Sequence, residues 1–161
     1  MLDRVHAHPL LPDQCELVFS KSPFGGEVGF AHCIDTSTSK EDVYYLALIL
    51  EDKHAGAPGR GHGAVTLAML DEAMGRAASQ TVDKLCFTVS MTTNFCSGSK
   101  IGEFLVAEAH VQRKGKSMVF VEAKLHGETA LIATASGVFA NSGIPIPKRG
   151  DLTPEAQTQA K

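Results

Sequence analysis

A single aspartate, Asp71, lies in a segment that is otherwise rich in apolar and small residues, AVTLAMLDEAMGRAASQ from Ala64 to Gln80. Removing an ionised carboxylate from water costs several kcal/mol unless a partner or hydrogen bonds compensate for it. One interpretation is structural: Asp71 and Glu72 form a solvated stripe, with Arg76 as the i,i+4 ion-pair partner of Glu72. The other is chemical, because such a carboxylate can act as a general base or a nucleophile. The structural interpretation explains Glu72 better than it explains Asp71.

Nine residues before Asp71, the pair His62-Gly63 stands where a glycine-rich stretch meets the same apolar segment. If a helix begins there, the backbone N–H groups of Gly63 and Ala64 have no partner within the helix and lie at its positive end. Such groups can stabilise the negative oxygen that develops on a carbonyl under attack. By spacing alone, this amide cluster and the carboxylate could together hold a carbonyl and activate a water or attack directly, which is an alternative to the structural interpretation. The His62 side chain has two open interpretations, as a further ligand of the carbonyl or water, or as a hydrogen-bonding residue that orders the loop.

A helix and the loop before it must position these residues. Good helix formers fill residues 64–80 without a proline, which predicts a helix there. Apolar or small residues surround nearly the whole helical wheel, so other parts of the chain must enclose this helix. The preceding stretch 52–63, DKHAGAPGRGHG, contains four glycines and a proline. We expect a loop without regular structure that lets the backbone approach a ligand closely.

The remaining ordered chain predicts strands. Segment 86–96, CFTVSMTTNFC, alternates Phe87, Val89, Met91 and Phe95 with hydroxyl and amide residues, which is typical of a strand with one apolar and one polar face. β-branched and aromatic residues predict five further strands. The first two of these form a hairpin and the last three an antiparallel meander. The five strands are expected at residues 28–34, 43–51, 103–113, 117–126 and 129–140.

One helix enclosed by a mostly antiparallel sheet is an α+β arrangement, expected as a single domain over residues 27–141. Residues 1–26 indicate an irregular lead-in, and residues 142–161, which have little to bury, indicate a mobile tail. The helix covers only one face of such a sheet. We therefore expect a second subunit to cover the other face or an edge strand, which makes the protein a homo-oligomer.

Composition and charge argue against several other classes of protein. A length of 161 residues fits one domain, and a net charge of −3 with a pI near 6.1 indicates no nucleic-acid partner. The N-terminus lacks the pattern of a secretory signal and no apolar run is long enough to span a membrane, so we expect a cytoplasmic protein without a membrane partner. No cysteine or histidine spacing indicates a metal site. The cysteines are interpreted as small buried hydrophobic residues: Cys15, Cys33, Cys86 and Cys96.

Four stretches resemble the hot-dog-fold acyl-CoA thioesterases, in particular the branch that contains the phenylacetate-pathway thioesterase. They are HGAVTLAMLDEAMGRAA, TVSMTTNF, RKGKSMVFVEAKL and ATASGVFA, and the similarity extends in order over about residues 22–140. The resemblance implies a hot-dog fold, in which a mostly antiparallel sheet wraps a long central helix. It also implies hydrolysis of an acyl-CoA without a separate cofactor, because coenzyme A is part of the substrate.

The resemblance further implies a role for individual residues. In that family the residue after the histidine donates its backbone N–H to the thioester carbonyl, here Gly63. The acidic residue nine positions after the histidine is the general base or nucleophile, here Asp71, and a hydroxyl residue on the next strand, here Thr88, assists it. Each family site lies between two subunits of a dimer or a dimer of dimers, with the glycine loop from one subunit and the carboxylate from the other. Basic hairpin residues bind the coenzyme phosphates in that family, which here implies Arg113, Lys114 and Lys116.

Two positions depart from the family pattern, and the three cations by themselves favour an ordinary exposed turn. Many relatives have an asparagine six residues before the histidine, and this chain has Gly56 there; Ala64 replaces the second glycine of His-Gly-Gly. Losing one carbonyl donor can lower turnover about 100- to 1,000-fold. Three functions stay open: hydrolysis of a medium-chain or aryl acyl-CoA, binding of acyl-CoA without hydrolysis, and dehydration of a hydroxyacyl thioester. Candidates for shaping an acyl pocket are Met69, Met74, Phe95 and Phe104.

Overall fold

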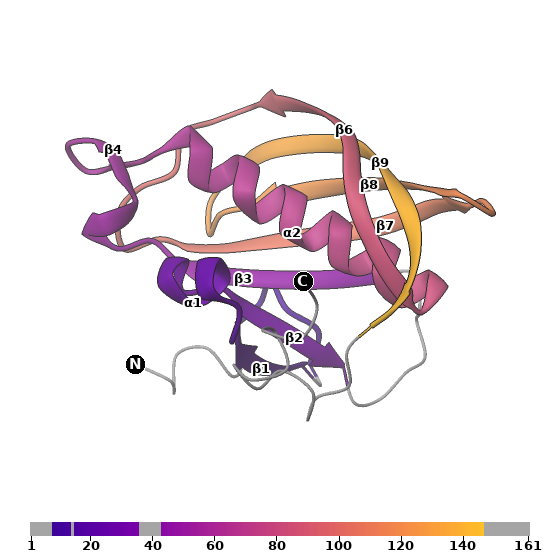
Figure 1. Cartoon of the computed structure of the whole chain (residues 1–161). Helices are drawn as coiled ribbons and strands as arrows, with labels where there is room; N and C mark the ends of the chain where they lie inside the picture. The colour runs from indigo at the N-terminus through magenta and orange to yellow at the C-terminus, as the bar shows by residue number, and fades with distance from the viewer. Residues whose placement is uncertain (1–7, 14, 36–42, 147–161) are drawn as a thin grey trace.

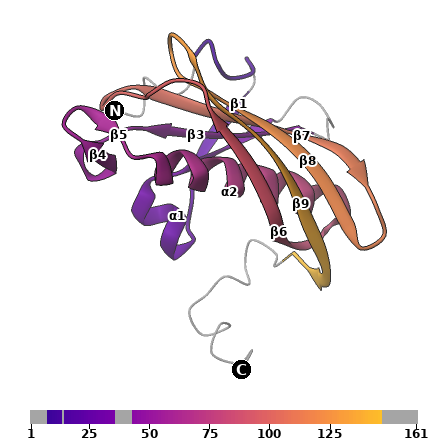
Figure 2. The same cartoon turned by 90° about the horizontal axis from the view of Figure 1, so that it is seen from above.

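The computed structural model describes residues 8–13, 15–35 and 43–146. A seven-stranded antiparallel sheet curves around one long helix, α2, which lies against one face of the sheet (Figures 1 and 2). In chain order the elements are β1 (Cys15–Phe19), α1 (Pro23–Val28), β2 (Ala31–Asp35), β3 (Val43–Ile49), the 3-10 helix η2 (Asp52–His54), β4 (Ala55–Ala57), β5 (Arg60–Gly61), α2 (Gly63–Val82), β6 (Lys84–Phe95), β7 (Phe104–Lys114), β8 (Met118–His126) and β9 (Leu131–Pro145).

The strand order in the large sheet is β1-β2-β3-β7-β8-β9-β6. The predicted hairpin of β2 with β3 is confirmed, as is the meander of β7, β8 and β9. β6 pairs with β9 and ends the sheet, so its other edge carries no strand within the described part of the chain. A long edge strand of this kind is open to pairing with a second chain.

The predicted central helix is confirmed and is slightly longer than expected. His62 caps its start, and Asp83 ends it in the left-handed backbone conformation with φ 54°. Met69, Leu70 and six other residues of α2 are buried against the sheet. Its remaining side carries charge, and the predicted ion pair between Glu72 and Arg76 is present at 2.9 Å.

Two hydrophobic clusters lie on opposite faces of the sheet. The larger joins α2 to the inward side chains of β3, β7, β8 and β9. The smaller lies on the other face, where β1 and β2 contribute Cys15, Leu17 and Cys33 and the segment before β1 contributes Leu10 and Leu11. Cys15 and Cys33 form a disulfide between β1 and β2. The interpretation of these two cysteines as unlinked hydrophobic residues is therefore wrong, because cross-strand pairing brings their sulfurs together.

Several expectations about the first part of the chain also need correction. Residues 1–26 are not an irregular lead-in throughout, because they contain β1 and most of α1. Val28 ends α1 and is not part of a strand. The glycine-rich stretch 52–63 contains η2 and the two-stranded sheet of β4 and β5. At the other end β9 extends to Pro145, and the predicted tail from residue 147 onward lies outside the described residues.

The expected alternation along β6 is interrupted by a bulge. The pairing with β9 shifts between Thr88 and Ser90. Before the shift Thr88 pairs with the buried residue Phe139, and after it Met91 pairs with Gly137, so even-numbered residues face α2 first and odd-numbered residues afterwards. The single apolar face predicted for this strand is therefore wrong. The consequence for function is that the hydroxyl of Thr88 points toward α2.

Candidate active site

Asp71 and Thr88 form a hydrogen-bonded pair between α2 and β6. The Thr88 hydroxyl donates from Oγ1 to Asp71 Oδ1 at 2.7 Å. Asp71 is half-buried on the charged side of α2, and the β6 bulge turns the threonine toward it. One oxygen of the carboxylate is thereby oriented. The second oxygen can accept a proton or approach an electrophilic carbon.

The pair lies at a groove of about 410 Å³ along the outward side of α2. Gly75 and Ser79 continue the helix wall of the groove, and Leu85 to Thr88 form the wall from β6. The Ser79 hydroxyl accepts from the backbone N–H of Cys86 at 3.0 Å, which ties the two walls together. Burial raises the pKa of the Cys86 thiol, so this cysteine is a poor nucleophile at neutral pH.

A tyrosine of β3 that the sequence did not single out lines the groove and hydrogen-bonds a histidine of β2. The buried Tyr44 hydroxyl bonds His32 Nδ1 at 2.7 Å, with Tyr44 lining the groove. Burial raises the pKa of Tyr44. Burial, together with the positive charge of Arg76, lowers the pKa of His32 from its usual 6.5. Both side chains are therefore neutral at pH 7. Every residue of β3 is apolar or aromatic, so the sequence indicates neither that Tyr44 faces the helix nor which residue it contacts.

At the start of α2 the predicted pair of unpartnered amides is reduced to Gly63, because the Ala64 N–H already has a partner. His62 Nδ1 accepts from the backbone N–H of Ala64 at 2.9 Å, so a neutral ring carries its proton on Nε2. This bond fits the interpretation that His62 orders the loop, and it leaves Nε2–H as a donor. The exposed Gly63, the first residue of the helix, follows it.

Gly56 packs directly against His62. A Cβ added to Gly56 would lie 2.7 Å from His62 Cδ2 and 3.0 Å from His62 Cα, too close for any side chain without a shift of the histidine. At the position where the family resemblance implies an asparagine, this chain therefore has the His62 imidazole in the adjacent space. His54 holds the same loop through two hydrogen bonds. Its Nε2 bonds the Val28 carbonyl at 2.7 Å, and its own carbonyl accepts from the backbone N–H of His62 at 2.8 Å.

Asp71 and Gly63 of one chain cannot act on the same carbonyl. Eight residues of continuous helix separate them, which is about 12 Å at the standard rise per residue. A carbonyl oxygen accepts hydrogen bonds at about 3 Å, and a nucleophile must approach the carbon of that carbonyl at a similar distance. Of the arrangements that the spacing left open, cooperation within one chain does not fit this separation. A site that uses both needs them from different chains.

The three predicted phosphate-binding cations lie around the hairpin of β7 and β8, away from Asp71. Lys114 donates from Nζ to the Thr81 carbonyl at 2.6 Å, at the C-terminal end of α2. This contact is about ten residues, or roughly 15 Å, along the helix from Asp71. Arg113 is exposed at the end of β7, and Lys116 is exposed in the turn that follows. The groove wall from Gly75 to Gln80 leads from the carboxylate toward these cations.

The residues proposed from sequence to shape an acyl pocket divide into two groups. Met69 and Met74 lie on the side of α2 that faces the sheet and are fully buried. Phe104 belongs to the cluster on the opposite face of the sheet. None of these three is near the groove surface, so the expectation is wrong for them. Phe95 is exposed, and its ring would lie 3.5 Å from a Cβ on Gly63.

Two kinds of feature are absent from the described residues. No cluster of three or more His, Cys, Asp or Glu side chains is arranged to hold a metal ion. None of the helices found there combines the length and the apolar character that a membrane span requires.

The family model described as the thioesterase superfamily matches residues 59–133, which include Gly63, Asp71 and Thr88. A protein of Pseudomonas aeruginosa is 28% identical over 80% of this chain and 96% of its own length. Its name proposes that it is an esterase. Human acyl-coenzyme A thioesterase 13 is 30% identical over 47% of this chain and 55% of its own length.

A solved structure of the E. coli PaaI protein, from the phenylacetic acid degradation operon, superposes with a TM-score of 0.71. It is 16% identical and covers 79% of this chain and 89% of its own, so the likeness establishes the fold alone. The resemblance expected from sequence is therefore confirmed: the chain has the hot-dog fold and matches the thioesterase superfamily.

Proposed function

We propose that this protein hydrolyses an acyl-CoA to a free acid and coenzyme A, with Asp71 as the reacting carboxylate. The observation that carries the proposal is the bond from Thr88 Oγ1 to Asp71 Oδ1 beside an open groove. A purely solvated acidic stripe has no need of a bulged strand that turns a hydroxyl toward it. Human acyl-coenzyme A thioesterase 13, which matches part of this chain, supports a CoA thioester as the substrate.

The proposed reaction uses groups that the chain itself supplies. The thioester oxygen accepts from the backbone N–H of Gly63, at the positive end of α2, and His62 Nε2–H is a second donor in reach of the same region. Asp71 removes a proton from a water molecule, whose oxygen attacks the carbonyl carbon. The C–S bond then breaks, and the leaving thiolate takes up a proton. Direct attack by the carboxylate, followed by hydrolysis of the resulting anhydride, uses the same residues.

A second copy of the chain completes the site. Gly63 lies beside Phe95 and Asp71 beside Thr88, so the two halves of the chemistry adjoin opposite ends of β6. If the free edge of β6 pairs antiparallel with the same strand of a second copy, a pairing centred between Met91 and Thr92 sets Phe95 opposite the partner subunit's Thr88. Gly63 of one copy then approaches Asp71 of the other. Two equivalent sites result, and neither exists in a single chain.

The coenzyme arm and the acyl group need separate space around the reacting carbonyl. For the phosphates we propose Arg113, Lys114 and Lys116. The Lys114 ammonium has three N–H donors and uses one on the Thr81 carbonyl, so two remain for an anion. The proposed acyl groups are medium-chain or aryl, and the groove beside Asp71 offers the apolar surfaces of Leu85 and Tyr44 for them.

The test is release of free thiol from a panel of short, medium-chain and aromatic acyl-CoAs, measured with a disulfide dye. Wild type should release thiol from at least one member. Asp71→Asn, which keeps the shape of the side chain, should lower kcat by at least about 100-fold, since the group that accepts the proton is lost. Asp83→Asn is the matched control, because Asp83 ends α2 and asparagine tolerates the left-handed conformation there. Equal activity of Asp71→Asn and wild type would refute the assignment.

Binding without hydrolysis is the second candidate function, and Gly56 is the observation that favours it. The glycine removes a side-chain donor from the carbonyl site, and the His62 ring occupies the adjacent space. In that case wild type would release no thiol from any acyl-CoA, yet titration calorimetry would detect a complex with an acyl-CoA. Asp71→Asn would then leave the affinity nearly unchanged.

A further inference from the structure

A row of polar groups follows the groove from Asp71 toward the C-terminal end of α2. Small residues form the floor of the groove, since Gly75 and Ser79 follow Asp71 at successive turns of the helix. Arg76 and Gln80 each come one residue after a floor residue, which turns them about 100° around the helix to the rim opposite β6. A channel with a flat floor and a polar rim suits an extended polar chain.

Arg76 is held at this rim with most of its donors unused. Its Nε donates to Glu72 Oε1 at 2.9 Å, and the guanidinium makes no other hydrogen bond within the described part of the chain. The N–H groups of both Nη atoms remain for a ligand, and the second oxygen of Glu72 remains as an acceptor. The pair therefore offers donors and an acceptor side by side, which is the complement of an amide group. The negative charge of Glu72 disfavours a phosphate at the same place.

Gln80 offers the same combination one turn further along α2. Its side-chain amide is exposed, and it forms no hydrogen bond with another described residue. Beyond it, the Lys114 ammonium lies on the Thr81 carbonyl at the end of the helix. The order along α2 is therefore a reacting carboxylate, two groups that complement amides, and a cation.

The pantetheine arm of coenzyme A carries its polar groups in the same order and at similar spacing. Each bond of an extended chain advances roughly 1.2 Å, so the first amide carbon lies about 6 Å from the thioester carbon, the second about 5 Å further and the phosphorus about 6 Å beyond that. Along α2, Arg76 lies about 7.5 Å from Asp71, and Gln80 about 6 Å from Arg76. The remaining differences of about 1–1.5 Å per step are small beside the length of these side chains.

We propose that the Arg76–Glu72 pair and Gln80 bind the two amides of the pantetheine arm, and that this contact selects pantetheine thioesters over simple ones. The inference rests on the proposed hydrolysis at Asp71. Arg76 donates to the carbonyl of the amide nearer to the sulfur, and Glu72 accepts from its N–H. The Gln80 amide pairs in the same way with the second amide, and the phosphates then reach Lys114.

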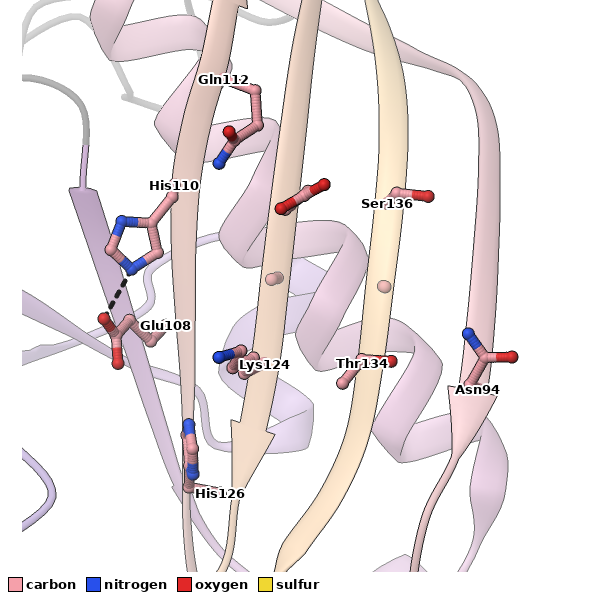
Figure 3. Close-up of a pocket in the computed structure, with 11 residues that line it drawn as sticks. Asn94, Glu108, His110, Gln112, Lys124, His126, Thr134 and Ser136 are labelled. Carbon is pink, nitrogen blue, oxygen red and sulfur yellow. Dashed lines mark hydrogen bonds and ion pairs between the residues drawn. The ribbon is translucent and has the colours of Figure 1, made fainter.

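A larger hollow in the described structure is not an alternative route for the arm. It has a volume of about 550 Å³ and lies on the face of the sheet that points away from α2 (Figure 3). Side chains of β6, β7, β8 and β9 line this hollow, and neither Asp71 nor any residue of α2 does. The sheet would separate an arm bound there from the reacting carboxylate.

The test uses a ladder of thioesters that carry the same acyl group and an increasing part of the arm. S-ethyl thioesters have no amide, N-acetylcysteamine thioesters have the first amide, and pantetheine thioesters have both. For wild type, kcat/KM should rise roughly 10-fold with the first amide and about 5-fold with the second, because hydrogen bonds to charged groups contribute more than neutral ones. Thiol release with the disulfide dye measures each step.

Two variants assign the steps to residues. Arg76→Met removes the donors and keeps most of the side-chain length, so it should abolish the first rise and leave the second. Gln80→Met has nearly the shape of glutamine and should abolish the second rise alone. Lys21→Met removes a cation from an exposed position between β1 and α1 and should keep both rises. Melting followed by circular dichroism checks that each variant is folded.

Titration calorimetry with free coenzyme A provides a measurement that does not require catalysis. Arg76→Met and Gln80→Met should each weaken binding by about 5- to 10-fold, and Lys21→Met should leave it unchanged. If both groove variants bind more weakly and wild type releases no thiol from any thioester, the arm site stands and the proposed hydrolysis is refuted.

The opposite result separates the two proposals in the other direction. If wild type releases thiol, and neither groove variant alters the ladder or the affinity for coenzyme A, the arm site is overturned and the hydrolysis stands. A wild-type protein that neither releases thiol nor binds coenzyme A would overturn both.

Discussion

At the scale of single residues, the account depends on one hydroxyl and one carboxylate that approach each other from different elements. Thr88 donates to Asp71 at 2.7 Å, and among the described residues no other side chain hydrogen-bonds that carboxylate. A hydrogen bond to a charged group contributes about 1.5–3 kcal/mol when it is well formed. Because Thr88 is exposed, the lower end of that range applies to its effect on the reacting carboxylate.

Thr88→Val removes the donor and keeps the shape of the side chain. We expect kcat for acyl-CoA hydrolysis to fall roughly 10-fold, since about 1.4 kcal/mol corresponds to a factor of ten in rate. Steady-state kinetics of thiol release would measure the change. Thr88→Ser keeps the hydroxyl and should retain most of the activity. Equal kcat values for the valine and serine variants would mean that the hydrogen bond does not assist Asp71.

His32 predicts how stability depends on pH. Burial, followed by the charge of Arg76, holds its pKa below 6.5 in the folded protein. Above pH 6.5 the His32 ring is neutral in the folded and in the unfolded protein. Below pH 6.5 the unfolded chain binds a proton at His32 before the folded protein does. The free energy of unfolding therefore falls with pH until the pKa of the folded state is passed. His32→Gln should show a shallower decline in melting temperature between neutral and mildly acidic pH. A slope identical to that of wild type would contradict this.

At the scale of elements, α2 contains a glycine that its own geometry does not require. A Cβ on Gly75 would lie 3.5 Å from the Phe139 ring, which is ordinary van der Waals contact. Glycine inside a helix is less favourable than alanine by about 1 kcal/mol. Gly75 lines the groove beside Asp71, so the missing side chain widens the space along which a substrate would lie.

Gly75→Ala should therefore raise the free energy of unfolding by up to about 1 kcal/mol and narrow the groove at the same time. Urea denaturation would measure the stability. KM values for a linear and an aromatic acyl-CoA would measure the narrowing of the groove, and the change in KM should be larger for the aromatic acyl-CoA. A variant that is more stable and has unchanged kinetics would show that the substrate does not pass over Gly75.

The elements of this chain differ in how well the sequence predicts them. The helix over 64–80 was predicted correctly because good helix formers fill that segment without a proline. The later strands were predicted correctly because β-branched and aromatic residues are frequent over many positions there. The bulge in β6 was not predicted, since a one-residue shift leaves no mark on a pattern that already mixes threonine with phenylalanine. β1 was missed for a different reason: five residues between prolines are too short for period-two alternation to stand out.

The same difference applies to the candidate site. Asp71 was identifiable because a charge stands out among apolar residues, and Thr88 only through the family resemblance. Tyr44 and His32 were missed because their contact joins β3 to β2, and long-range pairing of polar groups leaves no local signal. Gly56 was recognised as a departure, but its contact with the His62 ring required the fold of the glycine-rich stretch.

At the scale of the whole molecule, the proposed site is incomplete in a single chain. About 12 Å of helix separates the Gly63 amide from the Asp71 carboxylate, and both adjoin β6, whose outer edge carries no strand among the described residues. Pairing of two β6 edges accounts for both features with one contact. The central claim is therefore that a thioesterase site forms from Gly63 of one chain and Asp71 of another.

Two inactive variants can test this claim by complementation. Gly63→Pro removes the backbone N–H donor, and proline is favoured at the first position of a helix, where the extended backbone of His62 (φ −74°, ψ 136°) already suits it. Asp71→Asn removes the carboxylate. Each variant alone should be inactive, because each lacks one group at both sites of the dimer.

The most direct measurement is thiol release from the best acyl-CoA after the two variants are mixed, dissociated and allowed to re-form dimers. A mixed dimer has one complete site, made of Gly63 from the Asp71→Asn chain and Asp71 from the Gly63→Pro chain. Random mixing makes half of the dimers mixed, so the account predicts recovery of about a quarter of the wild-type rate. If mass spectrometry detects mixed dimers and the mixture stays as inactive as either variant alone, the shared site is contradicted.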